Sequence, residues 1–182
     1  MPDETTISYE INKRNIIQFV SDSWDRFAIE NAAPQIQHQI VIGRCLLDFI
    51  TNIEVKDLYH RLIQNVRDHG RDIEFHFRCD SADQRRHMRI SMHLLSDEAI
   101  RFNSQLLHEE SRAAVKLLEP DQPRNKEFLL ICSWCNKLRL EADEWVEIEV
   151  AINKLHLFES DKLPQISHGI CPQCLAEVTQ KL

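Results

Sequence analysis

The stretch Asp72-Ile-Glu-Phe-His-Phe-Arg-Cys79 alternates polar and apolar side chains at every step. The alternation returns in residues 85–95 and 99–107, and only short polar turns separate the three segments. Successive side chains of a strand point to opposite faces of a sheet. Three such segments in a row therefore predict antiparallel strands with one buried face and one polar face.

The segments before this stretch supply the rest of one domain. Residues 7–11 and 15–20 are strand-like runs around a polar turn, which predicts a hairpin. Residues 21–23 offer helix N-cap chemistry, and residues 55–69 have the apolar spacing of an amphipathic helix, with Gly70 at its C-terminal cap. Helices inserted between two parts of one antiparallel sheet cover its apolar face. We predict an α+β fold: a five-stranded antiparallel sheet with helices on one face.

The order of these elements and three strings resemble a PAS domain, the bacterial sensor fold. The strings are SDSWDRFA (21–28), IGRCLLDFI (42–50), and FRCDS with RRHMR (77–81 and 85–89). The resemblance implies a sensory domain over residues 1–111 that binds a small molecule or a protein, as a homodimer. A ligand cavity between sheet and helices would be lined by Trp24, Phe27, Leu47, Phe75, Phe77, Met88, Ile90, Met92 and Phe102. Such positions also simply fill a core.

The polar face of these strands carries many cations. His76, His87 and His93 fall on it, as do Arg78, Arg85, Arg86 and Arg89. We expect these side chains to be solvated or paired across strands. The arginines could instead form an anion site or a dimer contact.

Two Cys-x-x-Cys pairs, Cys132 with Cys135 and Cys171 with Cys174, are the strongest chemical signal. Two thiolates three positions apart on a tight turn can face one ion, and two such turns complete the sulfur tetrahedron that Zn²⁺ accepts. A helix over residues 144–157 would take up the 35 residues between the pairs. We predict a structural zinc site in a ribbon-like module over residues 127–182. His168 is an alternative ligand, although with four cysteines it is expected to hydrogen-bond to the site or cap the turn.

The ribbon-like module also resembles a C-terminal motif found after PAS or receiver domains in bacterial signalling proteins. The motif reads I-C-x-x-C-K-x-I-R, then W-x-x-I-E-x-x-I, then S-H-G-I-C-P-x-C, and Asn136 and Leu138 depart from it mildly. The matching positions are Ile131, Cys132, Cys135, Lys137, Leu138, Arg139, Trp145, Ile148, Glu149, Ile152, Ser167, His168, Gly169, Ile170, Cys171, Pro172 and Cys174. The resemblance gives a signalling context and no mechanism. Trp134 and Trp145 are expected to form the small core of this module.

The PAS resemblance implies that the segment between the two modules transmits a signal from one to the other, and the alternative is a plain linker. Residues 107–118 are compatible with a helix, and residues 119–125 combine two prolines with five polar residues. We therefore place a helical connector and a proline-containing linker at residues 112–126.

Composition excludes several function classes. The net charge is −7, so the basic face of a nucleic-acid-binding zinc module is missing. No signal-peptide pattern and no run long enough to span a bilayer occurs, which favours the cytoplasm, where thiols stay reduced and bind metals. No hydrolase, phosphate-loop or zinc-protease motif is present, and the chain has three glycines. We expect no enzyme activity and no membrane or nucleic-acid partner.

These observations predict a non-catalytic bacterial signal-sensing protein. Its PAS-like domain would bind a small molecule or protein, and its zinc module would dock an unidentified signalling protein. The alternative is a redox-sensing or thiol-exchange protein that uses the same cysteine pairs. An iron–sulfur cluster is a further option for four thiolates.

Overall fold

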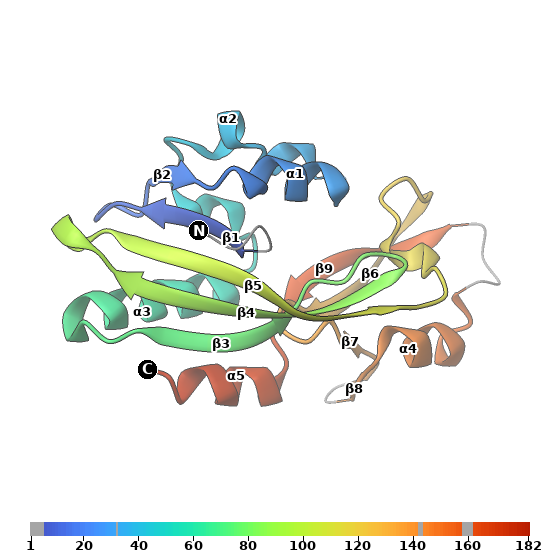
Figure 1. Ribbon diagram of the computed structural model, residues 1–182. Helices are drawn as coiled ribbons and strands as arrows, with labels where there is room; N and C mark the ends of the chain where they lie inside the picture. Colours follow the sequence, from blue (N-terminus) through green and yellow to red (C-terminus); the bar gives the residue numbers. More distant parts are fainter. Residues whose placement is uncertain (1–5, 32, 142–143, 158–161) are drawn as a thin grey trace.

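A five-stranded antiparallel sheet, in the order β2-β1-β5-β4-β3, forms the first half of the protein (Figure 1). The computed structural model describes residues 6–31, 33–141, 144–157 and 162–182. The strands are β1 (Thr6–Ile11), β2 (Ile17–Val20), β3 (Ile73–Arg78), β4 (Gln84–Leu94) and β5 (Ile100–Ser111). The predicted fold class is therefore confirmed, and the described residues contain no helix long and apolar enough to cross a membrane.

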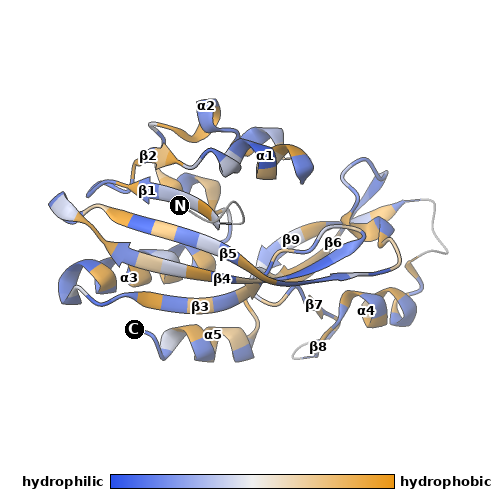
Figure 2. Ribbon diagram, viewed as in Figure 1, coloured by the Kyte–Doolittle hydropathy of each residue, from blue (hydrophilic) through white to orange (hydrophobic). Residues whose placement is uncertain are grey.

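The two faces of this sheet differ as the alternation predicts. On the inner face, Tyr9 and Phe102 lie directly opposite each other on β1 and β5, and their rings stack with centroids 4.5 Å apart. Helix α3 (Ile53–His69) contacts β4 and contributes Leu58, Leu62, Ile63 and Val66 to the same core. Hydrophilic and hydrophobic bands follow one another along these strands in Figure 2, and buried residues alternate with more exposed ones on β3 and β4.

Helix α3 has the ends that its sequence predicts. The side chain of Asn52 accepts a hydrogen bond from the Val55 amide, and Gly70 adopts the left-handed conformation, with φ 63°, just beyond the last turn. Short helices α1 (Ser23–Glu30) and α2 (His38–Val41) precede it, with single 3₁₀ turns at Pro34–Ile36 and Leu46–Phe49. No side chain caps α1. Instead the Ser21 hydroxyl accepts from the amide of Ser8 on the adjacent strand.

A second sheet, in the order β8-β7-β6-β9, follows in the C-terminal half. Its strands are β6 (Arg124–Cys132), β7 (Leu138–Arg139), β8 (Trp145–Val146) and β9 (Leu163–Gly169). Strands β6 and β9 are parallel, so a crossover must join them. Helix α4 (Ile148–Lys154) forms part of it and is shorter than predicted. Helix α5 (Pro172–Thr179) follows β9.

The predicted helix over residues 107–118 is wrong. Strand β5 continues to Ser111, and only a 3₁₀ turn at Lys116–Leu118 follows. The reason lies across the ladder, where Arg85 faces Glu110 and Arg86 faces Glu109. The Arg86 Nε atom is 2.7 Å from a Glu109 carboxylate oxygen. Opposite charges on neighbouring strands stabilise the extended conformation.

The proline-containing segment is fixed to the second sheet. Val115 and Leu117 are buried in the core of that sheet. The guanidinium of Arg124 donates hydrogen bonds to the carbonyl oxygens of Leu117, Glu119 and Pro164. Packing and hydrogen bonds therefore hold the connecting segment against the second sheet. The domain boundaries at residues 111 and 127 stay predictions.

Phe102→Ala tests the inner face. Phe102 is fully buried, so its truncation should lower the free energy of unfolding by about 3–5 kcal/mol. The matched control is Phe128→Ala, because Phe128 is 63% exposed and a change there should stay within about 0.5 kcal/mol. Urea denaturation followed by circular dichroism measures both. Equal losses would contradict the burial of Phe102 in the core.

Candidate metal centre

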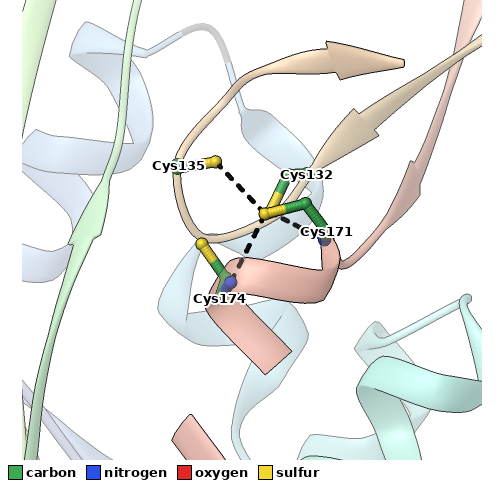
Figure 3. A group of neighbouring side chains, drawn as sticks. All are labelled: Cys132, Cys135, Cys171 and Cys174. Carbon is green, nitrogen blue, oxygen red and sulfur yellow. Dashed lines mark hydrogen bonds between the residues drawn. The ribbon is translucent and has the colours of Figure 1, made fainter. Parts of the chain in front are cut away.

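The first cysteine pair lies on a turn at the end of β6. The amide of Cys132 donates to the Lys137 carbonyl at 2.9 Å, and the amide of Asn136 donates to the Cys132 carbonyl at 2.9 Å. Asn136 has φ 56°, a left-handed conformation that asparagine tolerates. The turn is therefore closed by its own backbone, and it presents Cys132 and Cys135 toward the other pair (Figure 3).

The second pair lies at the start of α5. Cys171 is the N-cap residue, Pro172 occupies the first turn, and the Cys174 amide donates to the Cys171 sulfur at 3.4 Å. Amide groups at a helix N-terminus carry a partial positive charge, which stabilises thiolates. This pair is thus placed at the positive end of α5.

Parallel pairing of β6 with β9 brings the two turns together. Cys132 lies opposite Gly169 in the ladder, and the Ser133 amide donates to the Gly169 carbonyl at 2.8 Å. The Cys171 amide also donates to the Cys132 sulfur at 3.3 Å. Both strands end at the same edge, so the long interval between the pairs does not separate them in space.

The four sulfurs form a compact group. All lie within 4.8 Å of one another, and three of the cysteines are buried. The Cys135 and Cys171 sulfurs are 3.8 Å apart. A tetrahedron with Zn–S bonds of about 2.3 Å has edges of about 3.8 Å. The predicted ligands Cys132, Cys135, Cys171 and Cys174 are therefore brought together in an arrangement that suits a metal ion with four thiolate ligands.

Hydrogen bonds within the group perturb its thiols. Hydrogen bonds from Cys135 and Cys174 lower the pKa of Cys132 to about 2. The hydrogen bond with Cys132 raises the pKa of Cys135 to about 12 and is the main cause of a raised pKa at Cys174. A metal ion bound to these sulfurs would take the place of the thiol protons, so metal binding would depend on pH.

His168 lies apart from the sulfur group. It pairs with Ile131 in the β6–β9 ladder, and burial lowers its pKa. Within the part of the chain that the structure describes, its side chain makes no hydrogen bond to any of the four cysteines. The structure thus favours the four sulfurs over His168 as candidate ligands.

Trp134, between the first two cysteines, packs into the first sheet's core. Its ring centroid is 5.7 Å from those of Tyr59 on α3 and Phe75 on β3, and its carbonyl accepts from the Arg78 amide at 2.7 Å. Cys132, Cys171 and Cys174 belong to the same buried cluster. The expectation that Trp134 and Trp145 form a separate small core is wrong. Trp134 belongs to the buried cluster that includes α3 and the first sheet, and Trp145 packs against that cluster. Nothing in the residues around Trp134 predicts its contact with Tyr59 and Phe75.

A partly buried ion-pair network joins the same two halves. Arg78 pairs with Asp80 and with Glu147, whose carboxylate is 2.7 Å away. Arg112 lies 3.4 Å from Asp80 and 3.1 Å from Glu149. Arg85 contacts Glu149 at 3.1 Å and Glu147 at 3.8 Å. Burial opposes the charge of Arg78, but its hydrogen bonds to Asp80 and Glu147 raise its pKa above the usual value.

The arginines expected to be solvated or paired across strands therefore divide into two groups. Arg86 and Arg89 contact partners on the neighbouring strands of the first sheet. Arg78 reaches instead to Glu147, the residue that precedes α4. Arg85 does both, because it lies 3.6 Å from Glu110 on β5 and 3.1 Å from Glu149 in α4. These two side chains were expected on a free polar face, and the structure places them at the junction.

The expected ligand cavity is largely occupied by protein side chains. Phe75, Ile90, Met92 and Phe102 are buried in the core. Phe27 and Met88 line a small hollow of about 220 Å³ beside α1. A larger hollow lies on the opposite face of the sheet.

Zinc analysis tests the site directly. The purified protein should contain about one zinc ion per chain, because four thiolates form a closed structural site. Cys171→Ser should lose most of this metal, whereas Cys45→Ser should keep it, since Cys45 lies outside the sulfur group. Elemental analysis by mass spectrometry measures the content. A full complement of zinc in Cys171→Ser would refute the assignment.

Asp80→Asn tests the network. The Asp80 side chain is completely buried between Arg78 and Arg112, and loss of a buried partner costs about 3–5 kcal/mol. The control is Glu74→Gln. Glu74 is exposed and lies 3.7 Å from Arg89, so this change should lower the free energy of unfolding by at most about 1 kcal/mol. Chemical denaturation compares the two. Similar small losses would show that the network contributes little stability.

Comparison with known proteins gives similarity in fold only. No protein-family model matches the chain, and no curated protein matches it. Among solved structures, the PAS domain of the RpfR quorum-sensing receptor from Cronobacter turicensis, in complexes with C12:0 and with BDSF, aligns with 9% identity and a TM-score of 0.43. The alignment covers 59% of this chain and 99% of that one. A C-terminal domain from Streptococcus mutans has 13% identity and a TM-score of 0.42, over 56% of this chain and 75% of that one. The sheet order and its helices define a PAS-like fold, to which a four-cysteine cluster is attached.

Proposed function

We propose that this is a non-catalytic sensing and regulatory protein in which structural Zn²⁺ fastens the second sheet to the PAS-like domain. The observation that carries the proposal is the position of the sulfur group. Three of its four cysteines share one buried cluster with α3 and the first sheet. A metal there would stabilise the junction of the two halves.

The donor set supports a structural role for the ion. Four protein thiolates leave no open coordination position, so the ion would fix geometry and activate no water. When bound, it would hold the turn at Cys132–Cys135 against the start of α5. That arrangement keeps Trp134 between Tyr59 and Phe75. The reduced thiols that this needs are those of the cytoplasm, where we place the protein.

Three separate contacts couple the halves. They are the Trp134 packing, the arginine–carboxylate network, and a hydrogen bond from the Asn65 side chain on α3 to the Leu182 carbonyl beyond α5. A molecule that binds one half more tightly in one arrangement therefore shifts the other half, and this coupling is reciprocal. We propose that a small molecule or protein binds the PAS-like domain, and that the second sheet presents itself to a signalling partner. A homodimer is part of this proposal.

One observation favours a second candidate, a redox sensor. The Cys135 and Cys171 sulfurs are 3.8 Å apart, so a small movement would permit a disulfide in metal-free protein. A peroxide would accept the two electrons and two protons of these thiols and be reduced to water. Metal analysis with a thiol count separates the candidates, because stoichiometric zinc and protected thiols support the structural role.

Trp134 variants test whether this contact joins the second sheet to the PAS-like domain. Trp134→Ala should lower the free energy of unfolding by about 3–5 kcal/mol and split the urea transition, so that the two halves unfold separately. Chelation of the metal should split it in the same way. The control Trp134→Phe keeps an aromatic ring, although a smaller one, and the Nε1 atom that it removes is buried without a partner among the described residues, so most of the stability should remain. Tyrosine fluorescence and far-ultraviolet circular dichroism follow the transition. A single unchanged transition in Trp134→Ala would defeat the proposal.

A further inference from the structure

The outer face of the first sheet carries a concave hollow of about 920 Å³. This volume is within the range of small-molecule sites, about 300–1,000 Å³. Strands β1, β3, β4 and β5 form its floor, and the end of β2 with the start of α1 forms a wall. The lining residues are Thr6, Ser8, Phe19, Ser21, Asp22, Ser23, Arg26, Glu74, Arg89, Ser91, His93, Arg101, Asn103 and Gln105.

A row of neutral hydrogen-bonding groups crosses the middle of the floor. Ser8, Asn103 and Ser91 lie side by side on β1, β5 and β4. The Ser8 hydroxyl donates a hydrogen bond to the side-chain oxygen Oδ1 of Asn103 at 2.8 Å, which leaves the side-chain nitrogen Nδ2 of Asn103 to donate to a ligand. Ser91 contacts His93 at 2.8 Å. The row thus offers oriented donors and acceptors without a formal charge.

Arg89, Arg101 and His93 on the floor each lie beside a carboxylate, and the wall adds one residue of each sign, Asp22 and Arg26. Arg101 contacts Glu10 at 2.6 Å. His93 contacts Asp72 at 2.7 Å through its other ring nitrogen. Arg89 is 3.7 Å from Glu74 and also donates to Gln105. A charged ligand would have to displace these partners, so the floor favours an uncharged one.

An aromatic ring completes the surface. Phe19 on β2 is 44% exposed and belongs to the lining of the hollow. A sugar ring has an apolar face of C–H groups that packs on such a ring, and hydroxyls that both donate and accept at its edge. Serine hydroxyls, an amide and a guanidinium are suited to those hydroxyls.

We propose that this hollow binds an uncharged, hydroxyl-rich ligand, a mono- or oligosaccharide. The inference rests on the proposed sensing function and names the ligand class and its place. The inner face of the sheet is packed with side chains, including Trp134 from the cysteine turn. The sensing surface is therefore the outer face, and occupancy would act through the sheet on the β3–β4 ends that carry Arg78 and Arg85.

Titration of the full-length, zinc-loaded protein tests this by two-dimensional NMR. The probes are glucose, galactose, mannose, N-acetylglucosamine and maltotriose, with citrate and spermidine as charged counterparts. At least one sugar should give saturable shifts confined to β1, β4 and β5, and neither charged probe should. Asn103→Ala should weaken that sugar about tenfold, as the loss of one or two hydrogen bonds implies. His76→Ala should not change binding, because His76 lies on β3 outside the lining.

Three outcomes would overturn the proposal. They are no saturable shift with any sugar, shifts located away from the hollow, and equal binding of citrate or spermidine there. A dimer is the other possible occupant of this face. If light scattering shows a dimer, if Phe19→Ser dissociates it, and if no sugar binds, then a second copy of the chain covers the hollow and the proposal fails. Each of these results leaves the zinc content and the Trp134 unfolding results unchanged, so failure here is distinct from failure of the proposed function.

Discussion

The parallel pairing of β6 with β9 is the constraint on which the rest of the second half depends. Because the two strands point the same way, both end at one edge, and each delivers a cysteine pair there. The same edge lies against α3 and β3 of the first sheet. One backbone ladder therefore both assembles the sulfur group and sets it against the neighbouring core. An antiparallel pairing would have put the two turns at opposite ends.

Apolar and charged contacts contribute differently at the junction. Trp134 removes a large apolar surface from water, which is the main stabilising contribution available there. The network of Arg78, Asp80 and Arg112 with Glu147 and Glu149 is costly to desolvate, and such networks often add little net stability over apolar packing. Its directional hydrogen bonds instead fix one orientation of the second sheet. Together these contacts fix the orientation of the second sheet relative to the first.

Local patterns predicted most of the fold, and long-range pairing accounts for the errors. Alternation in residues 73–78 and the 3.6-residue period of residues 55–69 depend on near neighbours, so β3 and α3 were correctly predicted. Cysteine spacing likewise identified the four sulfurs. The helix predicted over residues 107–118 failed because Glu109 and Glu110 are held by arginines some 24 residues earlier. The burial of Trp134 against Tyr59 could not be inferred, because a local pattern marks a residue as apolar without naming the core that receives it.

The order of the cysteines along the chain has a consequence for biosynthesis. The 35 residues between Cys135 and Cys171 take about 2–7 s to translate at about 5–20 residues per second. During that interval the ladder between β6 and β9 cannot form, so Cys132 and Cys135 exist without the second pair. The four sulfurs meet only after Cys171 and Cys174 have left the ribosome. The junction of the two halves is therefore completed late in synthesis, and any metal ion that the four sulfurs hold enters only then.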